Sequence, residues 1–267
     1  MKLLKLYSMC IICTLSIGSH IYAQNDSDET KTGFPNVKLG VQNMFYWRGA
    51  PLSVFSTEEH TPTPLITGEF NYTKGAFTAG FWTGQSFSSE GYKNASYYVN
   101  FKHKNFQLSI WDIYTYSGVA ETKSKNFFNF KNEKTQHFID LNASYEFKKV
   151  PISIYLASII YGRDGALINN DYENRYSTYL KLNYNLKVAN GYSFDFYISG
   201  AGALNNIDDT NFYETAEASH PYGISEIGIT AHKSLKLSKN YSTPISVGAI
   251  FSPMNKRLDG LITIEFL

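Results

Sequence analysis

A strict alternation of apolar and polar residues constrains the fold of this chain more than any other feature. Val37, Leu39 and Val41 fall on one face of an extended segment. Lys38 and Gln42 fall on the other face. This period of two predicts β-strands, and no stretch of useful length has a helical period. The segments that share this period are residues 36–48, 65–73, 77–87, 95–102, 106–116, 138–147, 152–161, 176–188, 192–200, 223–237, 245–251 and 260–267.

The joints between these segments alternate between long and short. The joints 50–64, 88–94, 117–136, 162–174 and 201–222 are long, while 74–75, 103–105, 148–151 and 189–191 are short. The joint 238–243 is moderate in length, and the last joint, 252–259, is less distinctive. Most segments also have the ~9–11 residues with which a tilted strand crosses a bilayer. Outer-membrane barrels have long loops outside and tight turns on the periplasmic side, whereas a soluble sandwich has no reason to alternate. We therefore predict an all-β fold: a transmembrane antiparallel up-and-down β-barrel of about 12 strands. A soluble barrel with its apolar face inward is the alternative.

The N-terminal residues predict a domain plan of three parts. Lys2 and Lys5 precede an apolar stretch, and Ala23 is a small residue suited to the position before a cleavage site. The stretch is shorter than the ~20 residues of a membrane-spanning helix, so we expect a cleaved signal peptide at 1–23. A short polar leader at 24–34 and an outer-membrane β-barrel at 35–267 follow. Cys10 and Cys13 both fall in the signal, so the expected mature chain has no thiol for disulfides or metal sites.

Alternation assigns one face of the barrel to lipid and the other to the lumen. The expected outward set includes Val37, Leu39, Tyr97, Val99, Leu141, Leu156, Leu180, Leu182, Ile198 and Val247. The expected pore-lining residues are Lys38, Arg48, Glu69, Trp82, Lys102, Asp140, Glu146, Lys181, Asp195 and Glu226. His232 and the rings of Tyr98, Tyr155 and Tyr179 share that face. Balanced signs predict ion pairs across the lumen and weak ion selectivity, since strong selectivity needs a ring of one sign.

Two positions in this scheme need separate treatment. Arg48 ends the first segment on the inward face, where it could attract anions at a pore mouth. Pairing with an inward carboxylate on a neighbouring strand is the interpretation we favour. In segment 106–116, Asp112 shares a face with Leu108 and Ile110. A β-bulge near Ile110 would restore the alternation there.

Specific residues resemble a known family at this point. Tyr46-Trp47-Arg48-Gly49, with residues 64–72 (PLITGEFNY), is similar to the first hairpin of TorF-type porins. Residues 77–82 (FTAGFW) resemble that family's third strand, whereas Asn94-Ala95-Ser96 stands where the family usually has an acidic residue. The resemblance covers residues 36–116, with only the strand rhythm beyond. It implies an outer-membrane barrel with a pore role and supplies no catalytic residues.

Few constellations favour an enzyme. Glu58, Glu59 and His60 lack a second nearby histidine for a metal site. His137 stands near Asn142 and Ser144, the residue types of an outer-membrane lipase triad, which only geometry can establish. Asp171 and Asp208-Asp209 lie on expected loops without EF-hand spacing. We expect neither catalytic residues nor a cofactor or metal.

Two functional classes remain. The first is a small, weakly selective porin-like channel for small solutes. The second is a closed structural or surface-binding barrel whose loops contact partners. The expected partners are outer-membrane lipid and, through the aromatic C-terminal strand with Ile262, Ile264 and Phe266, the barrel-assembly machinery. A net charge of +1 gives no reason to expect nucleic acid.

Overall fold

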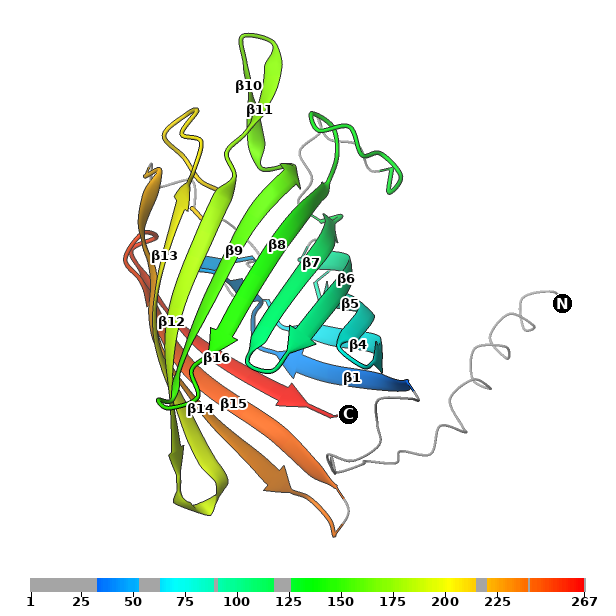
Figure 1. The fold of residues 1–267 in the computed structure, drawn as a ribbon, viewed down its shortest axis with the longest axis vertical. Coiled ribbons are helices and arrows are strands. Elements are labelled where there is room, and N and C mark those ends of the chain that lie inside the picture. The colour runs from blue at the N-terminus through cyan, green and yellow to red at the C-terminus, as the bar shows by residue number, and fades with distance from the viewer. Residues whose placement is uncertain are drawn as a thin grey trace, which may run out of the picture.

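Twelve long antiparallel strands form a closed barrel in the computed structural model (Figure 1). The structure describes residues 33–52, 63–88, 91–117, 126–214, 220–239 and 241–266. The barrel strands are β1 (Phe34–Gln42), β4 (Leu65–Lys74), β5 (Phe77–Ser86), β6 (Lys93–His103), β7 (Phe106–Thr115), β8 (His137–Glu146), β9 (Ile152–Gly162), β12 (Ser177–Val188), β13 (Tyr192–Ala203), β14 (Tyr222–Lys236), β15 (Ser242–Ser252) and β16 (Arg257–Glu265). The predicted all-β antiparallel barrel is therefore confirmed.

Each strand pairs with its neighbours in sequence, and the barrel closes between the first and last strands. β1 pairs with β4 on one side and with β16 on the other, where Val41 lies opposite Ile264. The backbone amide of Phe266 also donates to the carbonyl of Leu39 at 2.7 Å. A closed ring leaves no strand edge unpaired, which is what a strand in a bilayer requires because lipid offers no hydrogen bonds.

Joint lengths alternate as the sequence predicted. At one end of the barrel, the tight-turn end, Gly75 joins β4 to β5 with a positive φ of 59°, and the 3-10 helix η1 (Ala189–Gly191) joins β12 to β13. The long loops lie at the opposite, long-loop end, where the hairpin of β10 (Gly165–Ile168) and β11 (Asp171–Asn174) projects beyond the rim (Figure 1).

The exterior of the barrel is apolar along its length. On β12, Leu180 and Leu182 are 45% and 46% exposed. Tyr179, the residue before Leu180, lies on the inner face of the same strand and is only 3% exposed. Other exposed aliphatic side chains in the predicted outward set are Val37, Leu39, Val99, Leu141, Leu156, Ile198 and Val247. This facing contradicts the soluble-barrel alternative, in which the same residues would fill the interior.

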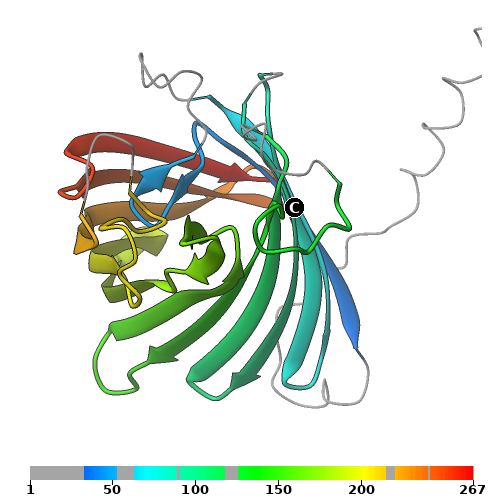
Figure 2. The ribbon, with the colours of Figure 1, turned by 90° about the horizontal axis from the view of Figure 1, so that it is seen from above.

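The first strand ends earlier than predicted. β1 stops at Gln42, and the chain then forms a small separate hairpin of β2 (Tyr46–Trp47) and β3 (Ala50–Pro51). Seen from above, this hairpin lies inside the ring of barrel strands (Figure 2). The prediction of one strand over 36–48 is therefore wrong in its last six residues. The alternation of apolar and polar residues continues through 46–48, but these residues belong to the hairpin and its turn and not to the barrel wall.

The predicted β-bulge near Ile110 is also wrong. Ile110 pairs in register with Val99 and with Leu141, without a shift along β7. The register shifts instead between Ile139 and Asp140 in the β8–β9 pair, and between Ser199 and Gly200 in the β13–β14 pair. Asp112 consequently stays on the outer face of β7, where its carboxylate lies 2.7 Å from a ring nitrogen of His137.

Candidate functional site in the barrel lumen

The turn of the β2–β3 hairpin places a buried charge, that of Arg48, inside the barrel. Arg48 and Gly49 form its two-residue loop with φ values of +52° and +93°, the pattern of a type I′ hairpin turn. A Cβ at position 49 would lie 2.9 Å from the carbonyl oxygen of Ser225, so only glycine fits there. Arginine rarely adopts a positive φ, and such local strain persists only where surrounding contacts over-determine it.

Those contacts are made by the Arg48 guanidinium. Its two terminal nitrogens donate to the carboxylate oxygens of Asp140 at 2.9 and 2.6 Å. The same nitrogens donate to Tyr213 Oη at 2.9 Å, Asn142 Oδ1 at 2.6 Å and Tyr155 Oη at 2.7 Å. Burial by itself would lower the pKa of Arg48, but Tyr213 and Asp140 beside it hold that pKa well above its ordinary value. The guanidinium is therefore a fixed positive charge that holds β8 and β9 to the hairpin.

The other side of the turn binds the opposite wall. The backbone amide of Gly49 donates to Glu226 Oε1 on β14 at 2.8 Å. Glu226 also accepts from the hydroxyls of Tyr179 and Ser199. The carbonyl of Gly49 accepts from the side-chain amide of Asn255 at 2.8 Å, in the turn between β15 and β16. Because these partners come from separate parts of the wall, the hairpin is fixed across the lumen.

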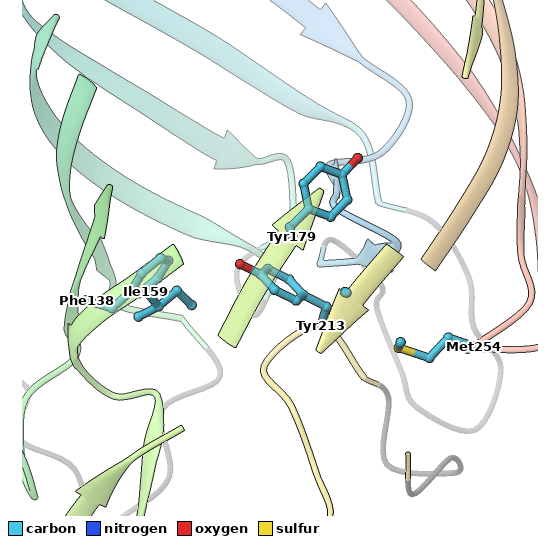
Figure 3. Close-up of a cluster of buried hydrophobic side chains, with 6 residues drawn as sticks. Phe138, Ile159, Tyr179, Tyr213 and Met254 are labelled. Atoms are coloured by element: carbon cyan, nitrogen blue, oxygen red, sulfur yellow. The ribbon is translucent and has the colours of Figure 1, made fainter. Parts of the chain in front are cut away.

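An aromatic cluster packs around the hairpin on its long-loop side. Its buried members are Phe138, Ile159, Tyr179, Ala201, Tyr213 and Met254 (Figure 3). Trp47 from the hairpin joins them, with its ring centroid 5.6 Å from that of Phe138 and 5.4 Å from that of Tyr213. Tyr213 is fully buried and comes from the loop between β13 and β14. That loop therefore reaches into the lumen.

A cavity of about 520 Å³ lies below the hairpin, toward the tight-turn end. Its lining combines tyrosine and tryptophan rings with charges of both signs, from Arg48, Lys181, Asp195 and Glu226, and with the imidazole of His232. The ammonium of Lys181 lies 3.7 Å from the ring centroid of Tyr197. Asp195 accepts hydrogen bonds from Asn183 and Asn185 and contacts His232 Nε2 at 2.9 Å. Polar walls of this kind suit a hydrated solute.

The remaining predicted pore-lining residues lie on inward positions away from this cavity. Lys38 Nζ is 3.5 Å from Glu69 Oε2, and Glu69 also accepts from Tyr98 and Asn71. Trp82 faces the hairpin from β5, with its ring centroid 5.4 Å from that of Phe45. The last two, Lys102 and Glu146, are exposed near the tight-turn end.

Arg48 pairs with an inward carboxylate, Asp140, as the favoured interpretation predicted. Its predicted position at the end of strand one and the predicted partner on a neighbouring strand are wrong. Four barrel strands separate β1 from β8, which carries Asp140. The pairing crosses the lumen because the hairpin turns inward. The only sign of this turn in the local sequence is the turn-forming pair Arg48-Gly49. Nothing in the sequence around Tyr213 distinguished it from ordinary loop residues.

Two further candidate constellations separate in space. His137 is on the outward face of β8, whereas Asn142 and Ser144 occupy inward positions, so they do not form the lipase arrangement. In the loops, Asp208 pairs with Arg175, whose Nε lies 2.8 Å from Oδ1. The segment with Glu58, Glu59 and His60 lies outside the described residues. Among the described residues, no group of three or more histidine, aspartate or glutamate side chains could hold a metal ion.

A closed antiparallel barrel with an apolar exterior and a polar interior defines the class of transmembrane β-barrels found in bacterial outer membranes. No family model matches the chain, and no curated protein matches it. Among solved structures, the NanC porin is similar: the alignment covers 87% of this chain and 100% of the porin's chain, at 6% identity and a TM-score of 0.45. The KdgM porin covers 88% and 99% at 8% identity and a TM-score of 0.42.

An outer-membrane channel from Pseudomonas putida is also similar. It covers 91% of this chain and 98% of its own, at 15% identity and a TM-score of 0.41. All three similarities have TM-scores below 0.5 and carry no functional argument.

Proposed function

We propose that this barrel is a porin-like channel of the outer membrane that passes small solutes with weak ion selectivity. The observation that carries the proposal is the cavity of about 520 Å³ in the lumen, lined by charged and aromatic side chains on the tight-turn side of the hairpin. A twelve-stranded barrel is wider than the eight-stranded kind that side chains fill, which leaves space for a water-filled path. The inward hairpin and Tyr213 narrow that path.

Weak selectivity follows from the charges that face the lumen. Lys38 pairs with Glu69, and Arg48 pairs with Asp140. Lys102 and Lys181 stand against Glu146, Asp195 and Glu226, so neither sign forms a ring. Residues of the proposed pore lining are thus largely neutralised by their neighbours, and the channel discriminates poorly between anions and cations.

Planar-bilayer recordings test the proposal. The intact protein should give small conductance steps with a reversal potential near zero in a salt gradient. Replacing residues 44–51 with a short Gly-Ser link should enlarge the steps, because the link removes the hairpin from the lumen. Shortening the β10–β11 hairpin, at residues 166–173, is the matched control and should leave the steps unchanged, since that hairpin projects beyond the rim.

A closed structural or surface-binding barrel is the second candidate, favoured by the bonds that fix the hairpin across the lumen. The recordings separate the two. If neither the intact protein nor the variant without the hairpin gives steps, while both still fold into membranes, the closed barrel is the better explanation. We propose no enzymatic activity for either candidate.

Export and assembly complete the proposal. The mature chain starts at Gln24 after cleavage of residues 1–23, crosses the periplasm and is inserted by the barrel-assembly machinery. The resemblance of residues 36–116 to TorF-type porins supports the same location and pore role. Outer-membrane lipid and small solutes are the partners that this function requires.

A further inference from the structure

A segment of the long loop between β7 and β8 folds down over the outside of the barrel. Phe127 packs on outward-facing rings of the wall, 4.9 Å from Tyr114 and 6.2 Å from Tyr97 between ring centroids. The hydroxyl of Tyr161, on β9, donates to the carbonyl of Phe130, and the amide of Gly162 donates to Asn132 Oδ1 at 3.2 Å. Segment 126–136 (the described part of this loop up to His137) therefore spans the outer surface from β6 to β9.

This placement accounts for the carboxylate on the outer face of β7. Asp112 shares that face with Leu108 and Ile110, which are 39% and 45% exposed. Its carboxylate lies 2.7 Å from Nδ1 of His137, while Nε2 of His137 donates to the carbonyl of Phe127 at 2.6 Å. His137 is fully buried beneath the segment. The segment thus covers a charge that bare lipid would not tolerate well.

The segment keeps its shape through its own turns. Asn126 Oδ1 accepts from the amide of Phe128 at 3.0 Å, and Asn129 Oδ1 accepts from the amide of Lys131 at 3.1 Å. The amide of Thr135 donates to the carbonyl of Lys131 at 2.8 Å. These hydrogen bonds fix the conformation of the segment, so its outward-facing side chains form a defined surface.

That outer surface combines aromatic and basic side chains. Phe128 is 81% exposed and Phe130 is 42% exposed. Lys131 and Lys134 are exposed beside them, against the single Glu133. Exposed aromatic rings next to lysines are typical of elements that lie in a membrane interface, where the rings enter the headgroup region and the lysines meet anionic lipid.

The depth of the segment agrees with that environment. Tyr97 lies four residues along β6 from Lys93. At the rise and tilt of barrel strands this corresponds to roughly 10 Å down the outer wall. Other exposed aromatic side chains, Tyr116 and Tyr161, mark the same end of the barrel. The segment therefore stands at the level where aromatic girdles meet headgroups.

We propose that segment 126–136 is an interface anchor that binds the phosphate groups of lipid headgroups in the outer leaflet. Phe128 and Phe130 insert among the headgroups, and Lys131 and Lys134 pair with the phosphates. The inference rests on the membrane location proposed above, and the experiment separates the two.

Site-directed spin labelling provides the test. The chain from Gln24 onward has no cysteine, so single nitroxide labels can be placed freely. The labelled variants are Phe128→Cys, Leu180→Cys on the lipid-facing side of β12 and Leu167→Cys on the projecting β10–β11 hairpin. In vesicles, oxygen should collide best with the label at 180 and an aqueous nickel chelate best with the label at 167. The label at 128 should fall between them, at interface depth.

The phosphate part is tested with two vesicle compositions. Adding phosphatidylglycerol to phosphatidylcholine vesicles should lower nickel access to the label at 128. In the Lys131→Gln/Lys134→Gln variant this difference should disappear. The control variant Lys148→Gln/Lys149→Gln changes the same charge in an exposed tight turn and should keep it.

Each failure has a separate meaning. A label at 128 that is as open to nickel as the label at 167 overturns the anchor, and a lipid difference that survives loss of both lysines overturns phosphate binding. If the label at 180 is itself open to nickel, the proposed membrane location fails, and the anchor fails with it.

Discussion

Arg48 and Asp140 are 92 positions apart in the chain and meet inside the barrel through hydrogen bonds of 2.9 and 2.6 Å. Both residues are buried, at 7% and 2% exposure. The pair connects the hairpin that follows β1 to β8, which four barrel strands separate from β1, and so holds the hairpin across the lumen.

Breaking this pair from one side should destabilise the barrel. Arg48→Met leaves the Asp140 carboxylate buried without its cation, which costs about 3–5 kcal/mol in comparable buried pairs. Asp140→Leu should have a similar effect, whereas the double variant should lose less than the sum of the two. Urea unfolding in lipid vesicles measures these free energies. Strictly additive losses would show that the two side chains do not interact.

The facing of β12 gives a comparison at constant depth. Leu180→Arg places a charge on the lipid face, at about 2–4 kcal/mol near the membrane midplane. Lys181→Leu removes an ammonium that faces the lumen and the ring of Tyr197. Folded protein recovered from outer membranes should therefore fall more for Leu180→Arg. A larger loss for Lys181→Leu would mean that the lipid and lumen faces of this strand are exchanged.

Asp164 should make stability depend on pH. It lies in the loop after β9 and accepts from the amide and hydroxyl of Ser177 at 2.6 and 2.8 Å, yet burial raises its pKa to about 6. The unfolded carboxyl releases its proton near pH 4. Between about pH 4 and about pH 6 only the folded state holds the proton, so this group's contribution to stability falls as pH rises.

The variant Asp164→Asn has no proton to release and should lack that decline. Unfolding midpoints measured for both proteins across this pH range test the expectation, because other titrating groups contribute equally to each. Parallel curves would show that Asp164 does not titrate differently in the folded barrel.

The N-terminus of the exported protein should lie at or near Gln24. Lys2, Lys5, the short apolar stretch and Ala23 motivate this expectation. N-terminal sequencing of protein from outer-membrane fractions gives the answer directly. An intact Met1 in that fraction would rule out cleavage.

The folded barrel should be heat-modifiable on gels. A closed ring of paired strands should resist detergent without heating, so unboiled and boiled samples should migrate differently. Circular dichroism should show strand and little helix. A protein that is monodisperse in plain buffer without detergent contradicts the exposed apolar exterior.

Local alternation was sufficient to predict the wall of this barrel. The twelve segments read from the sequence match the twelve barrel strands to within a few residues, and Leu180 and Lys181 face as expected. The reason is that the two faces of a barrel strand meet different surroundings, so the polarity of each residue indicates the face on which it lies. Where a strand leaves the wall, as at Gln42, the period continues and the prediction overruns.

What crosses the lumen or wraps the exterior was decided only by the tertiary structure. The sequence showed Arg48 and Asp140 as inward charges but could not say that they meet, because their contact depends on a hairpin turning inward. The sequence also showed that Asp112 breaks the alternation, but the β-bulge predicted there was wrong. Asp112 stays on the outer face and contacts His137, which is buried beneath a loop folded onto the outer wall. Such contacts join residues far apart in sequence, and no local period records them.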